Sequence, residues 1–180
     1  ELAEKRKIMN MQARERTQET RAWWIRRMAS TSYPAREKCV LFWHGHWATS
    51  IQKVNDPFLV LQQNQTLRAH AFGPFAPFAK EISKDPAMIR YLDLNSSKAG
   101  HPNENFAREL MELFILGEGH YSEEDIQEAA RAFTGYRINP ETGAFHFSRK
   151  NHDAGVKKIF GKSGAFDGDA AIDLIVSQPQ

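Results

Sequence analysis

Apolar side chains recur at helical spacing along most of the chain. In residues 2–29 they lie among abundant arginine, glutamate and glutamine with no proline or glycine, which predicts one long amphipathic helix or two in succession. Further helices are predicted over residues 34–50 and 58–72. Another follows Asp85, a helix-capping residue with Pro86 at the first helical position. The pattern is typical of a mainly α protein.

The best-defined helical pattern covers residues 103–116 and ends at Gly117. A second helix is predicted over residues 122–134, with Ser122 and Asp125 spaced as a short capping box. Because only a short loop joins the two helices, we expect them to be antiparallel neighbours at the centre of the domain. The apolar positions expected to be buried there are Leu110, Leu113, Ile126 and Phe133.

A β-pattern is evident at residues 136–147, where aromatic and β-branched residues alternate on both sides of an Asn-Pro-Glu-Thr-Gly turn and predict a hairpin. The remaining tail predicts a short extended piece and a helix capped by Asp167. The predicted fold class is therefore mainly α: a multi-helix, orthogonal or bundle-like single domain over residues 1–180 with one small β-hairpin.

The composition narrows the classes of function only slightly. The chain has 180 residues, 24 lysines and arginines, and 22 aspartates and glutamates, so its net charge of +2 gives no field that would attract nucleic acid. Its apolar stretches are far shorter than the roughly 20 residues needed to cross a bilayer. We therefore predict no nucleic-acid partner and no transmembrane segment.

Two histidines stand in the aromatic segment "FWHGHWATS" at residues 42–50. His44 and His46 are two residues apart, so a continuous helix directs them to nearly opposite faces and prevents them from chelating one ion together. The neighbouring aromatic residues need burial, which draws at least one histidine close to the core. Either histidine can join a site assembled from other segments, or serve only as a hydrogen-bonded group at the edge of the core.

Carboxylates concentrate in "NENFARELMELF" at residues 103–114. Glu109 and Glu112 are three apart and share one helix face, whereas Glu104 and Arg108 are four apart and are predicted to form an ion pair. Two like charges on one face favour a cation between them. Three readings stay open: a solvated face, a buried network with Arg108 or Arg131, and a metal or acid–base site.

The loop "NHDAG" at residues 151–155 adds a histidine and a carboxylate. His152 and Asp153 can form a turn or ligate a metal. The sharpest hypothesis from the residues is a divalent-metal site made by His44, Glu109, Glu112 and His152, with Asp153 as a further ligand. The rival is a structural ion-pair network in which Arg108 or Arg131 supplies the positive charge, without a metal.

Three segments in order resemble one protein family: "EKCVLFWHGHWATS", "PNENFARELMELFILGEGHYSEEDIQEAARAFTGYRI" and "FHFSRKNHDAGVKKIFG". They are similar to the motifs of the bacterial domain-of-unknown-function family 1800, over roughly residues 20 to 176. The sequence departs from the family pattern at Tyr136, where tryptophan is more frequent, and at Phe106, where tyrosine is common. Neither change removes a polar ligand.

The resemblance implies several further expectations. Family members are usually longer, so the chain is expected to be an internal fragment that self-associates through an apolar surface left by missing helices. Many members resemble exported proteins encoded near sulfatase-like proteins, which implies a periplasmic or extracellular location. The activity stays open between a helical scaffold that binds an exported sulfatase-like protein or a cell-envelope polymer, and a metal-dependent or acid–base enzyme using the His/Glu cluster.

Overall fold

The computed structural model describes residues 1–179, with the side chains of residues 2, 3, 5, 6, 9 and 10 outside the description. The chain is mainly α-helical, as predicted. Its first half consists of helices joined by short turns: α1 (Leu2–Ser30), α2 (Pro34–His46), α3 (Ile51–Val54), α4 (Pro57–Ala69), α5 (Phe75–Ser83) and α6 (Pro86–Tyr91).

The second half adds helices and two small antiparallel strand pairs. Strands β1 and β2 form the predicted hairpin, whereas the pair β3–β4 replaces what was predicted only as a short extended piece. The elements are η1 (Leu94–Ser96), α7 (Glu104–Glu109), η2 (Leu110–Ile115), α8 (Glu123–Ala132), β1 (Tyr136–Ile138), β2 (Phe145–Phe147), η3 (Arg149–Asn151), β3 (Lys157–Ile159), β4 (Lys162–Gly164) and α9 (Gly168–Val176).

The predicted helix caps are confirmed. The Asp85 side chain accepts hydrogen bonds from the amides of Ala87 and Met88 at the start of α6. The Ser122–Asp125 capping box opens α8, and Asp167 caps α9. These side chains satisfy amides that the first helical turn leaves without partners, which explains why their positions are readable from sequence.

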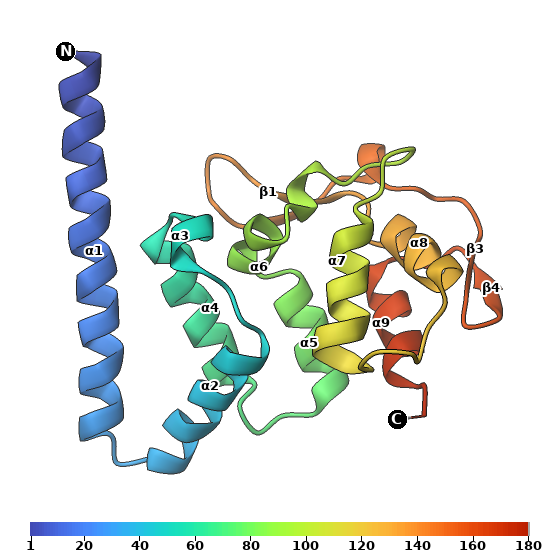
Figure 1. Ribbon diagram of the computed structural model, residues 1–180, viewed down its shortest axis with the longest axis horizontal. Coiled ribbons are helices and arrows are strands. Elements are labelled where there is room, and N and C mark those ends of the chain that lie inside the picture. Colours follow the sequence, from blue (N-terminus) through green and yellow to red (C-terminus); the bar gives the residue numbers. More distant parts are fainter. Residues whose placement is uncertain (180) are drawn as a thin grey trace.

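Figure 1 shows α1 along one side of the molecule, with its N-terminal half extending beyond the other elements. The C-terminal half of α1 contacts α2 and α4. The main core lies among α5, η2, α8 and α9, where Phe78, Phe106 and Phe133 are fully buried. The molecule therefore joins a closed core to a peripheral helix.

The predicted helix at residues 103–116 changes character halfway. It is α-helical up to Glu109 and continues as the π-helix η2, in which the amide of Leu116 donates to the carbonyl of Met111, 2.7 Å away. The wider π turn buries Leu110, Met111, Phe114 and Ile115 and leaves Leu113 59% exposed. Leu113 was predicted to be buried, and that prediction is wrong because it assumed α-helical spacing.

Helices α7 and α8 pack against each other as predicted, and Leu110, Ile126 and Phe133 are buried. Figure 1 shows α8 lying obliquely across α7. The antiparallel direction of the pair stays a prediction.

Several large apolar side chains remain exposed, including Leu41, Phe42 and Phe72, each at least half accessible. Phe42 was expected to be buried with its aromatic neighbours, but only Trp47 is fully buried and Trp43 is half-buried. Phe42 instead lies on the outer side of α2, its ring against those of Trp43 and His46. Self-association through an apolar surface stays a prediction.

Candidate functional site

His46 joins the two chemistry-rich segments of the sequence. Its Nε2 lies 2.8 Å from the carbonyl oxygen of Phe114, inside the π-helix. The ring also contacts five aromatic neighbours: Phe42, Trp43, Trp47, Phe75 and Phe114. His46 therefore acts as a hydrogen-bonded packing residue between α2 and η2, as one of the open readings held.

His44 faces α1 instead. Its ring meets that of Trp24 edge-on, with the ring centroids 5.0 Å apart. Burial lowers the pKa of His44 below its ordinary value of 6.5, so the ring is neutral at pH 7. The two histidines thus point to different helices, as their spacing predicted.

The acidic residues of α7 and η2 separate as well. Arg108 forms a two-pronged ion pair with Glu123, with both N–O distances 2.8 Å, so the predicted Glu104–Arg108 pair is wrong. Glu112 accepts a hydrogen bond from the Tyr121 hydroxyl at 2.8 Å. Glu104 is exposed, and the side chain of Glu109 forms no hydrogen bond or ion pair with any residue in the described part of the chain.

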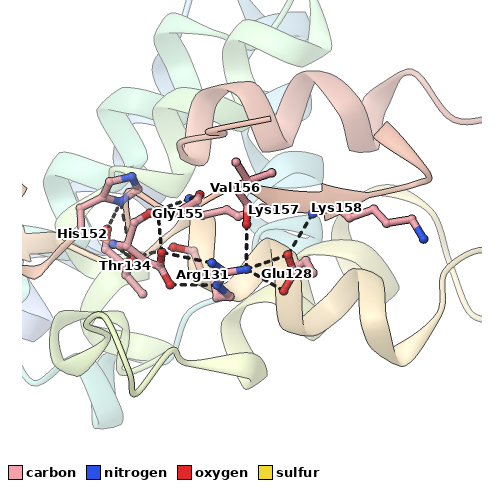
Figure 2. Close-up of polar contacts among 9 residues, drawn as sticks. Glu128, Arg131, Thr134, His152, Gly155, Val156, Lys157 and Lys158 are labelled. Atoms are coloured by element: carbon pink, nitrogen blue, oxygen red, sulfur yellow. Dashed lines mark hydrogen bonds and ion pairs between the residues drawn. The ribbon is translucent and has the colours of Figure 1, made fainter. Parts of the chain in front are cut away.

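Arg131 forms ion pairs with Asp153 and with Glu128, in a polar cluster between α8 and the loop after η3; Figure 2 labels Arg131 and Glu128. The Arg131 guanidinium donates to both oxygens of Asp153, at 2.8 and 3.2 Å, and to both oxygens of Glu128, each at 2.8 Å. It also donates to the carbonyl of Val156 at 3.2 Å. Each of its three nitrogens therefore has a partner.

The same loop is pinned by Thr134 and by a buried lysine. The Thr134 hydroxyl donates to the carbonyl of Arg131 at 2.6 Å and accepts from the amide of Asp153 at 2.7 Å. His152 Nδ1 lies 2.9 Å from the Thr134 carbonyl. Lys157 is fully buried, and its ammonium donates to the carbonyls of Asp153 and Gly155, at 2.5 and 3.0 Å.

The charges of this cluster balance one another. The hydrogen bonds from Arg131 lower the pKa of Asp153 to about 2, so its carboxylate is ionised at neutral pH. Burial lowers the pKa of the Lys157 ammonium. Two cations, Arg131 and Lys157, face two anions, Asp153 and Glu128. We call these four residues with Thr134 and His152 the Arg131 cluster. Its Arg131–Asp153 pair agrees with the structural ion-pair reading, whereas Glu112 bonds Tyr121 and is not part of the cluster.

The residues predicted as metal ligands contact different neighbours and do not meet at one place. His44 contacts Trp24, Glu112 contacts Tyr121 and His152 contacts Thr134. Within residues 1–179, no group of three or more histidine, cysteine, aspartate or glutamate side chains is placed to hold a metal ion. The divalent metal stays a prediction from sequence without a grouped set of ligands.

A groove runs beside α1, on the side that faces α2, α3 and α4. Its main hollow has a volume of about 330 Å³ and is lined by Trp23, Trp24 and His44 together with residues of α1, α3 and α4. A second hollow of about 280 Å³ adjoins it toward the N-terminal end of α1 and shares Thr17, Ile51 and Pro57 with it. We call the two hollows the α1 groove; the volume of each is near the lower end for small-molecule sites.

One buried carboxylate fixes the back of the groove. Glu37 on α2 is 3% exposed. Its carboxylate forms ion pairs with Arg27 of α1 at 3.0 Å and with Arg68 of α4 at 2.8 Å, and it accepts a hydrogen bond from the Trp24 indole at 3.3 Å. These partners, Arg68 foremost, lower the pKa of Glu37 to about 2. Glu37 was not predicted from sequence; the available signal was its place three residues before Val40, on the same buried helix face.

The fold thus combines a mainly helical domain and its Arg131 cluster with a groove at the peripheral helix α1. No helix in residues 1–179 is long and apolar enough to cross a membrane. The chain belongs to the family described as "Protein of unknown function (DUF1800)", whose model matches residues 2–180, a wider range than the three motifs span. No curated protein and no solved structure matches the chain.

Proposed function

We propose that this chain is a binding domain that holds a cell-envelope polymer in the α1 groove, without carrying out catalysis itself. The lining of the groove carries the proposal. The indoles of Trp23 and Trp24 line the main hollow beside several hydrogen-bonding groups, and Arg27 and Arg68 lie over the Trp23 ring. A saccharide presents the complementary surface, because the C–H face of its ring is apolar and its rim carries hydroxyl groups.

The hydroxyl groups of the groove are prepared to accept hydrogen bonds. Thr17 and Thr20 donate to carbonyls one turn back in α1, at 2.8 and 2.9 Å. Thr49 donates to Gln63 at 2.6 Å, and Ser50 donates to Gln52 at 2.7 Å. Each hydroxyl has thus used its single proton and keeps free lone pairs. A ligand rich in O–H donors, such as a polysaccharide, satisfies them.

The Arg131 cluster is a poorer candidate for the binding site than the α1 groove. Its charged groups have their hydrogen bonds inside the protein, so they hold the loop in place. The α1 groove, in contrast, presents polar groups to solvent, as a binding site requires. Such a ligand implies that the chain acts outside the cytoplasm.

The experiment is co-sedimentation with insoluble peptidoglycan and with insoluble cell-wall polysaccharide. Thr17→Trp fills the middle of the groove, and Gln12→Trp places the same side chain on an exposed part of α1. We expect the wild type and Gln12→Trp to sediment with the polymer and Thr17→Trp to stay in solution. Wild-type protein that binds neither polymer, or Thr17→Trp protein that binds as well as the wild type, would contradict the proposal. Binding only to an exported sulfatase-like protein would replace it.

A further inference from the structure

We infer that the α1 groove selects a glycan that carries carboxylate groups, and that Arg14 and Arg21 recognise them. This inference rests on the proposed function and names the class of ligand for the same groove. Arg21 lines the main hollow and Arg14 lines the adjoining one. The two residues are seven positions apart on α1, so they follow each other along the same helix face, about 10 Å apart at the 1.5 Å rise of an α-helix.

Both guanidinium groups are unpaired. In the described part of the chain, neither Arg14 nor Arg21 forms an ion pair or a side-chain hydrogen bond. Arg27 and Arg68, which lie nearby, share the carboxylate of Glu37 as their ion-pair partner. Arg14 and Arg21 are therefore the guanidinium groups of the groove lining that are open to a ligand.

The rest of the lining does not cancel this charge. None of the described residues that line either hollow is an aspartate or a glutamate. His44, the other titratable group of the main hollow, is neutral at pH 7 because burial lowers its pKa. The groove consequently joins a positive edge to hydroxyl acceptors and indole faces.

A carboxylate fits this edge. Guanidinium groups bind carboxylates through two parallel hydrogen bonds, which fix orientation as well as charge. The remaining hydroxyls of an acidic sugar meet the acceptors supplied by the threonine and serine residues. Two arginines in successive hollows suit a polymer that repeats its carboxylate along the chain, whereas a single small acid uses only one of them.

The test measures affinity for oligogalacturonate and for a neutral galactan oligomer of equal length, by calorimetry at constant ionic strength. We expect the wild type to bind the acidic oligomer about tenfold more tightly, which corresponds to about 1.4 kcal/mol, because charge-assisted hydrogen bonds form only with the carboxylates. Arg21→Gln is expected to lower that preference severalfold, because one of the two guanidinium groups of the groove is lost. Arg16→Gln removes the same charge from α1 at an exposed position outside the groove and serves as the matched control.

The outcomes separate the two proposals. Equal affinity of the wild type for both oligomers overturns the carboxylate inference and leaves polymer binding standing. An equal loss in Arg16→Gln and Arg21→Gln also overturns it, because the charge of α1 then acts without a defined site. Absence of binding to either oligomer and to the insoluble polymers overturns the proposed function itself.

Discussion

The Arg131 cluster and the α1 groove are both rich in polar side chains, but they differ in how those side chains are used. In the cluster, every nitrogen of Arg131 meets an oxygen of its own chain, and the charges balance. In the groove, Arg14 and Arg21 have no partner within the described residues, and the hydroxyl oxygens keep free lone pairs. A saturated set of charges stabilises a fold, whereas an unsaturated set is available to a ligand.

The two regions also differ in where they lie in the fold. The cluster ties the loop after η3 to α8, next to the main core. The groove lies at the edge of the molecule, where α1 meets α2 and α4 (Figure 1). Changes on the core side should therefore alter stability, and changes in the groove should alter binding.

The largest effect is expected where η2 enters the core. Leu110→Ala removes a side chain that is 2% exposed and should lower the free energy of unfolding by about 2 to 5 kcal/mol. Leu113→Ala is the matched control, because the π-helix turns Leu113 outward, and it should cost less than about 0.5 kcal/mol. Urea denaturation measures both. Equal losses would mean that residues 110–113 do not follow the π-helical arrangement.

The next effect is expected from the centre of the cluster. Arg131→Met removes the guanidinium that Asp153 and Glu128 share and leaves Lys157 as the remaining cation of the cluster, so it should cost about 2 to 3 kcal/mol. Arg108→Met removes a pair on the exposed side of α7 and should change the denaturation midpoint much less. If the two variants are equally stable, the cluster contributes no more than a surface ion pair.

Acid should weaken the same cluster in a defined range. The pKa of Asp153 lies at about 2 in the folded protein, below its ordinary value of 3.8, so its contribution to stability is complete above pH 4. That contribution is lost as the pH falls toward 2, because protonation breaks the pairing with Arg131. The difference in stability between wild type and Asp153→Asn should shrink over this range. A difference that is independent of pH would contradict the pairing.

The smallest effect on stability is expected in the groove. Thr17 hydrogen-bonds only to its own helix, so Thr17→Val should change the free energy of unfolding by less than about 0.5 kcal/mol. The same variant removes one acceptor from the groove and should weaken polymer binding measurably. Thermal denaturation and co-sedimentation of one preparation check both statements. A large loss of stability would mean that Thr17 has a structural role in the fold and is not mainly a binding residue.

Local features of the fold were readable from sequence because their causes are local. Asp85, Ser122 and Asp167 cap helices through amides two or three residues away, and each cap was predicted. The hairpin at residues 136–147 follows from its turn residues in the same way. The orientation of Leu113 was missed because a switch from α-helix to π-helix leaves no periodic mark over six residues.

The candidate sites were harder to predict than the helix caps, because tertiary packing decides which of their residues meet. Arg131 and Asp153 were both named from sequence, but their pairing across 22 residues is set by the loop around Thr134. The predicted metal ligands share no location because α2, η2 and the 152–153 loop face different neighbours. The α1 groove was missed entirely, since its lining comes from four separate helices and carries no motif.

The most direct test compares two variants in two assays. Arg131→Met and Arg21→Gln each remove one arginine, and each is measured for the free energy of unfolding and for affinity to oligogalacturonate. We predict that Arg131→Met loses stability and, at a temperature where it is folded, binds like the wild type, whereas Arg21→Gln keeps its stability and loses affinity. Folded Arg131→Met protein that fails to bind while Arg21→Gln protein binds normally would contradict the account, because recognition would then belong to the Arg131 cluster.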